Sequence, residues 1–176
     1  MRFHEWIVGR SVGASAFAAA ASIVSLLALS PSPVAAAADP GAFAALSGVW
    51  TGGGTLSLQN GTKERIRCRA QYVVSNNSTT VTQSLRCDSD NYHFHVNAFV
   101  NDKGGSLSGN WTEETRNASG TVSGRASGGT LSINVSAGGA FSARMTVATA
   151  GSGQSVDIKV KGADITDVSV KMGRAH

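Results

Sequence analysis

Apolar and polar residues alternate with a period of two along most of the chain after Ala45. Segments rich in glycine and asparagine interrupt this alternation, and no window shows a convincing apolar repeat of 3.6 residues. Such alternation is typical of strands with one buried face, and such interruptions are typical of turns. The pattern predicts ten strands, over residues 47–59, 63–75, 79–87, 91–100, 105–114, 119–126, 129–136, 140–148, 154–161 and 165–172.

The connections between consecutive predicted strands are too short for a crossover, so neighbouring strands must pair antiparallel. Closing such a meander into a barrel removes its exposed edges. The sequence therefore predicts an all-β fold, an antiparallel up-and-down meander of about ten strands that forms a closed or nearly closed barrel. The apolar members of each alternation are expected inside this barrel, and the arginines and lysines outside.

The predicted turn at Asn77-Ser78 sets the pairing of the second and third strands. A two-residue turn there places Val74 opposite Val81 and Cys68 opposite Cys87. Directly opposite residues lie within disulfide distance, and an even cysteine count is typical of oxidising compartments. The pattern predicts a Cys68–Cys87 disulfide, and closing a loop of about 20 residues contributes about 3 kcal/mol by the chain-entropy estimate.

Two positions break the regular pairing. At Asn60-Gly61 a strict two-residue turn would place Leu56 opposite Arg65 on one face. A longer turn or a bulge, with Gly61 at positive φ, would place Leu56 opposite Ile66 instead. In the last strand the apolar residues change parity, which predicts a second irregularity near Thr166-Asp167.

Two nearly identical hexapeptides, LSGVWT and LSGNWT, contain Trp50 and Trp111. They lie 61 residues apart, and a spacing of about a dozen residues per strand makes this half of a ten-strand ring. We expect the two indoles to face each other across the barrel, although coincidence in a Ser/Gly-rich chain is the simpler explanation of the repeat.

The N-terminus has the three parts of a secretory signal: a basic start, an apolar run and an Ala-x-Ala site. We expect residues 1–38 to be a signal peptide, cleaved after Ala38, and residues 39–176 to form one β-barrel domain in the periplasm or outside the cell. The alternative is a membrane anchor, but the small residues and the cleavage site favour cleavage, so the mature chain is expected not to span a membrane.

The mature chain has 176 − 38 = 138 residues and a net charge of 13 − 10 = +3. This mild charge gives no reason to expect nucleic acid as a partner. The even strand count also suits an outer-membrane barrel, but that class needs an apolar outer surface and aromatic girdles, which this sequence does not supply.

The segment GVWTGGG, from Gly48 to Gly54, resembles the Gly-x-Trp opening of the calycin barrels, both lipocalins and nitrobindin-like haem barrels. In lipocalins this Trp closes one barrel end beneath an Arg from the last strand, and Arg174 stands in a comparable place. The resemblance implies a barrel that binds a small molecule. The chain departs from these families in having no helical lid between the first two strands. It also has no mature His at a haem-ligand position, unless His176 folds back.

The parity of the strands directs a set of aromatic and acidic side chains inward. These are the candidate ligand-binding residues: Trp50, Tyr72, Phe94, Trp111, Glu113 and Phe141. An inward Glu113 needs a partner, for which Arg116 is the nearest candidate. A structural ion pair at the barrel rim is the simpler explanation, and a ligand-orienting acid is the alternative.

Two short motifs resemble metal sites but have simpler explanations. His93 and His95 share one strand face, which suits metal chelation, yet this face is expected to be solvated. The segment CDSDN, from Cys87 to Asn91, has alternating oxygen ligands like a calcium loop, but it lacks the Gly and distal Glu of an EF-hand. A turn capped by its own side chains is favoured there, and we expect no metal and no cofactor.

The segment KERIRCR places four cations on one strand face, and Arg86 joins them across the hairpin. The resulting basic patch consists of Lys63, Arg65, Arg67, Arg69 and Arg86. Such a patch suits an acidic protein, a glycan or an anionic lipid surface, or else simply keeps the surface soluble and unpaired.

No nucleophile, phosphate-loop or metalloprotease motif is present, so we expect no enzymatic activity. The sequence favours an exported barrel that binds a small, apolar molecule in its interior. The alternative is an envelope interaction or structural protein that docks an acidic partner through its arginine-rich strand face.

Overall fold

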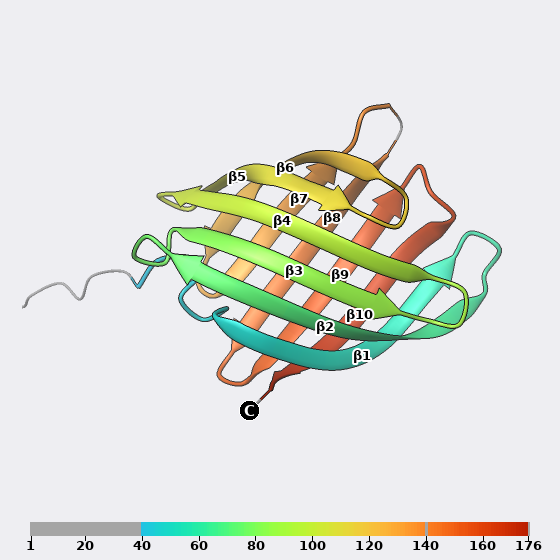
Figure 1. Cartoon of the computed structure of the whole chain (residues 1–176), viewed down its shortest axis with the longest axis horizontal. Helices are drawn as coiled ribbons and strands as arrows, with labels where there is room; N and C mark the ends of the chain where they lie inside the picture. Colours follow the sequence, from blue (N-terminus) through green and yellow to red (C-terminus); the bar gives the residue numbers. More distant parts are fainter. Residues whose placement is uncertain (1–39, 140, 176) are drawn as a thin grey trace, which may run out of the picture. The chain divides into compact units, whose positions relative to one another are not determined.

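The computed structural model describes residues 40–139 and 141–175, and these form a β-barrel without helices (Figure 1). Ten antiparallel strands close in the order β1-β10-β9-β8-β7-β6-β5-β4-β3-β2, so each strand pairs with its neighbours in sequence and β10 returns to β1. The strands are β1 (Gly48–Leu58), β2 (Lys63–Ser75), β3 (Thr80–Asp88), β4 (His93–Lys103), β5 (Ser106–Glu113), β6 (Ala118–Ser127), β7 (Thr130–Ser136), β8 (Ser142–Ala150), β9 (Gly153–Lys161) and β10 (Ile165–Arg174).

The predicted fold class is confirmed, and the strand ends differ from the predicted ones by a few residues. The predicted signal peptide lies outside the described residues, as does His176. Within the described part, no helix is long and apolar enough to cross a membrane.

The alternation of side chains along β2 shows why the sheet closes. Ile66, Cys68, Ala70 and Tyr72 are buried, whereas each residue between them is exposed. Successive strand side chains point to opposite faces, so the pattern is satisfied only when one face is enclosed. All ten strands contribute buried apolar side chains to one interior core.

The pairing of β2 with β3 is as predicted. Cys68 lies opposite Cys87 and forms a disulfide with it, and Val74 lies opposite Val81. The turn is centred on Asn77 and Ser78, which both have positive φ, and the Thr79 N–H donates to the Asn76 carbonyl at 3.1 Å. Two central residues at positive φ match the right-handed twist of a hairpin.

The pairing of β1 with β2 corrects one prediction. Gly61 has a φ of +83°, as expected, but Leu56 lies opposite Glu64, and Ile66 lies opposite Gly54. The reason is the turn: the Leu58 N–H donates to the Thr62 carbonyl at 2.9 Å, which encloses three residues and centres the hairpin on Asn60. This shift keeps the parity, so Leu56 is still buried.

The predicted irregularity in the last strand is confirmed. The β1–β10 register shifts between Ser57, which pairs with Asp167, and Leu58, which pairs with Ile165. Thr166 is therefore the extra residue of a bulge, and its hydroxyl donates to the Ser57 carbonyl at 3.2 Å. The bulge restores the inward direction of Ile165 after the parity change.

The glycines of β1 allow it to approach β10 closely. A Cβ atom at Gly52 would collide with the Lys171 carbonyl, and one at Gly54 with the Ser169 carbonyl. Both positions point inward, so these glycines let the barrel wall bend sharply where β1 joins β10.

The two hexapeptide tryptophans do not face each other, which corrects another prediction. β1 and β5 run in the same direction, because they are separated by four antiparallel pairings. Trp50 stands near the start of β1 and Trp111 near the end of β5, so they lie toward opposite ends of the barrel. We refer to the two ends as the Trp50 end and the Trp111 end. The turns at 76–79, 104–105, 128–129 and 151–152 lie at the Trp50 end.

Candidate functional site

The barrel encloses a cavity of about 80 Å³ between its two ends. All but one of its lining residues are apolar, aromatic or disulfide-bonded, and the exception is Gln83. The full lining is Phe43, Leu46, Cys68, Tyr72, Val81, Gln83, Leu85, Cys87, Val100, Leu131, Ile133, Met145, Val147, Val156, Ile158, Val168, Val170 and Met172. The cavity has about half the volume of an engineered apolar cavity of about 150 Å³ that binds benzene, so it has room for about three non-hydrogen atoms.

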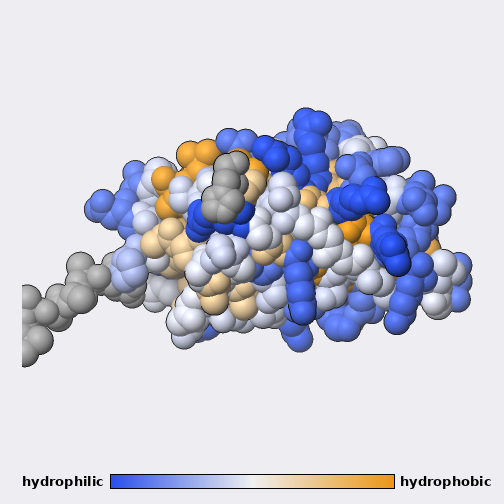
Figure 2. All heavy atoms as spheres, turned by 90° about the horizontal axis from the view of Figure 1, so that it is seen from below, coloured by the Kyte–Doolittle hydropathy of each residue, from blue (hydrophilic) through white to orange (hydrophobic). Residues whose placement is uncertain are grey.

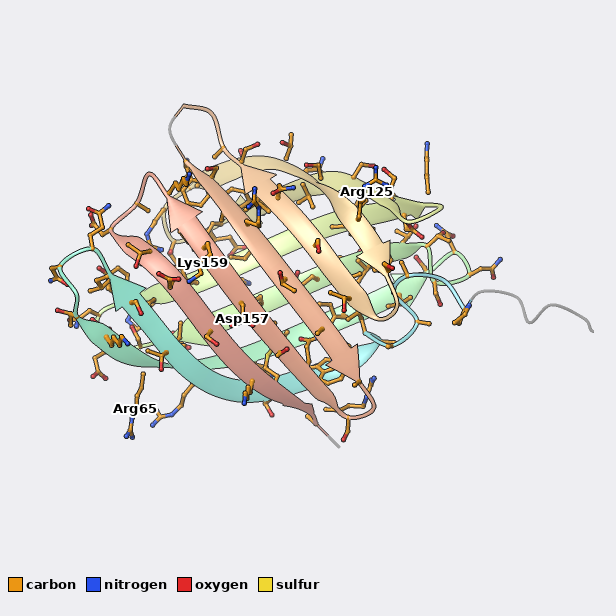
Figure 3. All side chains as sticks on the ribbon, turned by 180° about the vertical axis from the view of Figure 1, so that it is seen from behind. Arg65, Arg125, Asp157 and Lys159 are labelled. Atoms are coloured by element: carbon orange, nitrogen blue, oxygen red, sulfur yellow. A yellow bond between two sulfur atoms is a disulfide. The ribbon has the colours of Figure 1, made fainter. Side chains whose placement is uncertain are left out.

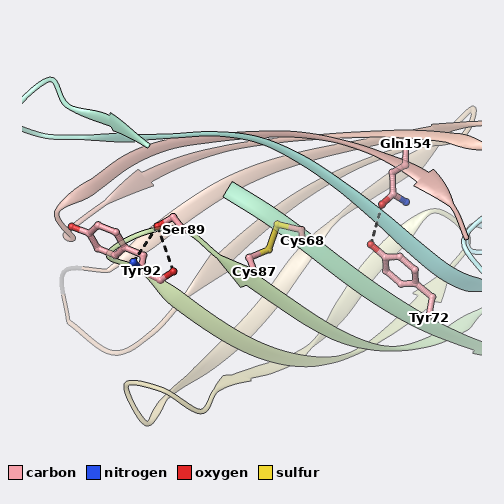
Figure 4. Close-up of a disulfide and its surroundings, with 6 residues drawn as sticks. All are labelled: Cys68, Tyr72, Cys87, Ser89, Tyr92 and Gln154. Atoms are coloured by element: carbon pink, nitrogen blue, oxygen red, sulfur yellow. Dashed lines mark hydrogen bonds between the residues drawn. A yellow bond between two sulfur atoms is a disulfide. The ribbon is translucent and has the colours of Figure 1, made fainter. Parts of the chain in front are cut away.

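The disulfide forms part of the cavity wall. Cys68 and Cys87 are both buried and join adjacent strands β2 and β3 at a Cα–Cα distance of 4.1 Å (Figure 4). Because the two residues are already paired in register, the bond fixes this wall of the cavity without moving the strands.

The Trp50 end of the cavity is closed by a segment that precedes β1. Phe43 and Leu46 are buried beneath the barrel, and the Phe43 N–H donates to the Ser78 carbonyl at 3.1 Å. The Trp50 Nε1 donates to the Leu46 carbonyl at 2.7 Å, which holds the segment in place. Phe43 and Leu46 lie before the first predicted strand, so alternation alone did not indicate their role.

Arg174, near the end of β10, covers Trp50 from outside. Its guanidinium carbon lies 4.4 Å from the centre of the indole, and its nitrogens donate to the carbonyls of Ser47 and Ala45. A guanidinium over an indole face is a favourable cation–π arrangement. The Trp–Arg pairing that the calycin resemblance implied is therefore present, and Trp50, which is fully buried, serves to close the barrel rather than to line the cavity.

One polar bridge crosses the interior near the Trp50 end. The Tyr72 hydroxyl on β2 donates to the Gln154 Oε1 on β9 at 3.2 Å (Figure 4). The Gln154 Nε2 in turn donates to the Thr149 hydroxyl at 3.1 Å. Burial raises the pKa of Tyr72 to about 12, although the bond to Gln154 lowers it slightly. Sequence alternation placed Tyr72 inside but did not identify Gln154 as its partner, because glutamine at the start of a strand is commonly exposed.

The Trp111 end is packed with aromatic side chains. Tyr92 and Phe94 stack with ring centres 6.2 Å apart, and Trp111 lies against Phe141 with ring centres 5.8 Å apart. The guanidinium of Arg116 covers Phe94 at 4.8 Å. None of these residues lines the cavity, so this end also serves as a closure.

Glu113 holds the connection between β5 and β6 at the Trp111 end. Its Oε1 accepts hydrogen bonds from the Thr115 hydroxyl at 2.6 Å and from the N–H groups of Thr115 and His95 at 3.1 Å each. Its Oε2 accepts the Arg116 N–H at 2.8 Å and lies 3.6 Å from the Arg116 guanidinium. Burial opposes ionisation of Glu113, but the bonds from Thr115, His95 and Arg116 outweigh it and lower its pKa. The carboxylate is thus a buried structural clamp, and its acceptors are occupied by the protein itself.

Of the six predicted ligand-binding residues, Tyr72 alone lines the cavity. Trp50 closes one end, and Phe94, Trp111, Glu113 and Phe141 pack the other. The Nε1 atom of Trp111 is buried and has no hydrogen-bond partner among the described residues. It lies against Gly120, where a Cβ atom would approach it to 2.9 Å.

The two histidines of β4 are engaged by different carboxylates. The His93 Nδ1 lies 2.8 Å from Asp88, and the His95 Nδ1 lies 2.5 Å from Glu114. Within residues 40–139 and 141–175, no group of three or more His, Cys, Asp and Glu side chains is placed to hold a metal ion.

The CDSDN segment forms the connection between β3 and β4 and is tied to Glu64. The Asn91 side-chain amide donates to the Glu64 carboxylate at 2.8 Å, and the Ser89 hydroxyl donates to it at 2.7 Å. These two bonds lower the pKa of Glu64. The Ser89 Oγ also accepts the Tyr92 N–H at 3.0 Å. The segment is therefore a turn capped by neighbouring side chains.

The predicted basic patch lies on the outer surface of β2 and β3. Lys63, Arg65, Arg67, Arg69 and Arg86 are all exposed. Arg69 lies opposite Arg86, so two cations are juxtaposed across the hairpin. Figure 3 shows Arg65 pointing away from the barrel.

A second hollow, open to the surface, lies at the Trp50 end. It has a volume of about 490 Å³ and is formed by the ends of four strands, β7 to β10, with the turn at 128–129. Gln154 and Met172 line it, and Met172 also lines the interior cavity.

No protein-family model matches this chain, and no curated protein is significantly similar to it. Solved structures share its fold. The crystal structure of Rv2717c from M. tuberculosis matches with a TM-score of 0.59, covering 75% of this chain and 94% of that one at 10% identity. The S-type phycobiliprotein lyase CPES from Guillardia theta matches with a TM-score of 0.56, covering 76% of this chain and 90% of that one at 12% identity. At such identities the likeness shows the fold alone, a calycin-like barrel.

Proposed function

We propose that this protein binds a small apolar molecule in the interior of its barrel. The observation that carries the proposal is the enclosed cavity of about 80 Å³ with its almost wholly apolar lining. Apolar cavities of this kind disfavour water and accept hydrocarbon groups, because few of their lining groups can replace the hydrogen bonds that a water molecule loses. The calycin-like fold of the neighbouring structures supports the same role.

The size of the cavity restricts the ligand. Sites for drug-sized ligands have about 300–1,000 Å³, several times the volume found here. The proposed ligand is therefore slender and places about three non-hydrogen atoms inside the barrel, such as the end of a short alkyl chain. Gln83 and the Tyr72–Gln154 bridge provide the polar atoms that would orient a single hydroxyl or carbonyl group.

The proposal includes no catalytic step and places the protein in the periplasm or outside the cell. The interior carboxylate, Glu113, is occupied by hydrogen bonds from its own loop, so it is not free to act as an acid or base. The disulfide supports an oxidising compartment, and so does the predicted signal peptide.

Thermal unfolding with added 1-propanol or 1-butanol tests the proposal. At ten times the dissociation constant, binding contributes about 1.4 kcal/mol, which raises the Tm of a domain of this size by about 4 °C. V156F fills the cavity and is expected to abolish the shift. V160F introduces the same side chain on the same face of β9, but Val160 does not line the cavity, so this variant is expected to keep the shift. No shift in the wild type, or equal shifts in both variants, would contradict the proposal.

A further inference from the structure

The outer surface of the barrel has one strongly basic face, and its cations are not neutralised. Arg65, Arg67 and Arg69 alternate along β2, and about 6.6 Å of strand separates one from the next. Arg86 on β3 lies opposite Arg69. None of these four guanidinium groups forms an ion pair with any described residue.

The register extends this face across β1 to β10. Arg67 pairs with Gly53, and Gly53 pairs with Lys171. Gly53 has no side chain, and its outward neighbours on β1, Thr51 and Thr55, are short, so nothing bulky separates Arg67 from Lys171. We call Arg65, Arg67, Arg69, Arg86 and Lys171 the basic face. Figure 2 views the molecule from below Figure 1, where β1 and β2 lie, and shows strongly hydrophilic side chains projecting there.

The acidic residues at the border of the basic face are already engaged. Asp88 lies opposite Arg67 in register but bonds to His93 at 2.8 Å. Glu114 bonds to His95 at 2.5 Å and to the Asn97 side chain at 2.7 Å. By contrast, Lys159, on β9, is paired with Asp167 and does not belong to the face. The unpaired cations therefore leave a net positive surface along β10, β1, β2 and β3.

Two large apolar side chains are exposed on the same side of the sheet. Val73 on β2 is 57% exposed and Phe99 on β4 is 45% exposed, and they are the exposed large hydrophobic residues of the described chain. Val73 and Phe99 both pair with Thr82 on β3, so they form one row across three strands. Val73 has the same parity as Arg65, Arg67 and Arg69 on β2, so it points to the same outer surface. One outward residue, Gln71, separates it from Arg69.

We infer that the outer surface of β1 to β4, with Lys171 of β10, docks onto an anionic lipid membrane. The basic face would meet the lipid phosphates, and Val73 and Phe99 would enter the interface. Lysine and arginine near an anionic membrane contribute about 1 kcal/mol each, and apolar burial adds to this attraction. An acidic polysaccharide would satisfy the cations but would offer no apolar surface for Val73 and Phe99, so the membrane is the partner that fits both features.

Co-sedimentation with vesicles tests the inference, using the full chain as its expression host processes it. Binding to phosphatidylcholine vesicles is expected to rise with added phosphatidylglycerol and to fall with salt. The variant R65Q/R67Q/R69Q is expected to bind about 100-fold more weakly, since each cation contributes about fivefold. The control R125Q/R144Q/K161Q has the same net charge but is altered on β6, β8 and β9, and it is expected to bind nearly as the wild type. Figure 3 shows Arg125 pointing outward from a different edge of the barrel than Arg65.

The variant V73S/F99S tests the apolar part of the surface. It keeps every charge, and it is expected to bind anionic vesicles severalfold more weakly while its affinity for soluble polygalacturonate is unchanged. Equal losses in the two charge variants, no effect of V73S/F99S, or binding to polygalacturonate without binding to vesicles would overturn the inference. Because the cavity is not altered in any of these variants, the outcome is independent of the proposed ligand binding.

Discussion

Replacing Glu113 by Gln tests whether this buried carboxylate is a structural clamp. The carboxylate accepts four hydrogen bonds from its own and the neighbouring strand end, three at Oε1 and one at Oε2. A glutamine of the same shape has one acceptor oxygen and must turn its NH2 group toward the other set of donors. At least one bond to a charged acceptor is lost, and such bonds contribute about 1.5–3 kcal/mol. We expect E113Q to lower the free energy of unfolding by about 2–3 kcal/mol.

Urea denaturation measures this loss, and E114Q is the matched control. Glu114 is the next residue and carries the same charge, but it is exposed, so we expect its replacement to cost at most about 1 kcal/mol. The pKa of Glu113 is lowered in the folded state, so its ionisation stabilises the fold above its ordinary pKa of 4.5. This contribution is lost as the pH falls through the lower, folded pKa. The gap between wild type and E113Q must therefore narrow in acid. Equal losses in both variants, or a gap that persists in acid, would refute the clamp.

Five other outcomes follow from the structure and the sequence. Y72F leaves the buried Gln154 Oε1 without its donor and should cost about 1–2 kcal/mol by urea denaturation, whereas Y92F should be nearly neutral. Wild-type stability should also fall as the pH rises from 10 toward 12, because burial holds Tyr72 neutral in the fold, and Y72F should lack this fall. G54A should cost about 3 kcal/mol because its Cβ meets the Ser169 carbonyl, whereas G138A, with open space around it, should be neutral. Replacing both Cys68 and Cys87 by Ser should cost about 3 kcal/mol in the same assay. For the exported wild-type protein, intact mass and N-terminal sequencing should give Asp39 as the first residue.

The features set by alternation and local turn chemistry were predictable from the sequence. Parity along β2 placed Cys68 and Tyr72 inside and Arg67 outside, because a strand has only two faces. The same reasoning located the Cys68–Cys87 pair and the bulge at Thr166. Each of these predictions depended only on how a strand pairs with its neighbour in sequence, and the short turns between such strands determine that pairing.

The features that depend on position along the barrel axis were not predictable in this way. Parity indicated that Trp50, Trp111 and Glu113 point inward, but it could not indicate the end of the barrel at which each lies. The β1–β2 register depended on whether the turn is centred on Asn60 or on Gly61, and parity is equally satisfied by pairing Leu56 with Glu64 or with Ile66. The small cavity volume follows from how the side chains of all ten strands pack together, which no local pattern specifies.

The basic patch illustrates the same division. Its arginines on β2 and β3 were evident in the sequence, because they alternate within one segment. Lys171 joined them only when β10 was found to pair with β1 opposite Gly53, a contact between residues more than 100 positions apart.

Mass spectrometry of the protein isolated from its natural source tests the central claim most directly. The protein should be purified without detergent, examined intact under non-denaturing conditions, and then extracted with organic solvent. We predict a bound apolar molecule whose buried part matches about three non-hydrogen atoms, and its absence from V156F but not from V160F. Recovery of the wild-type protein with no apolar molecule, or of the same molecule from V156F, would contradict the account.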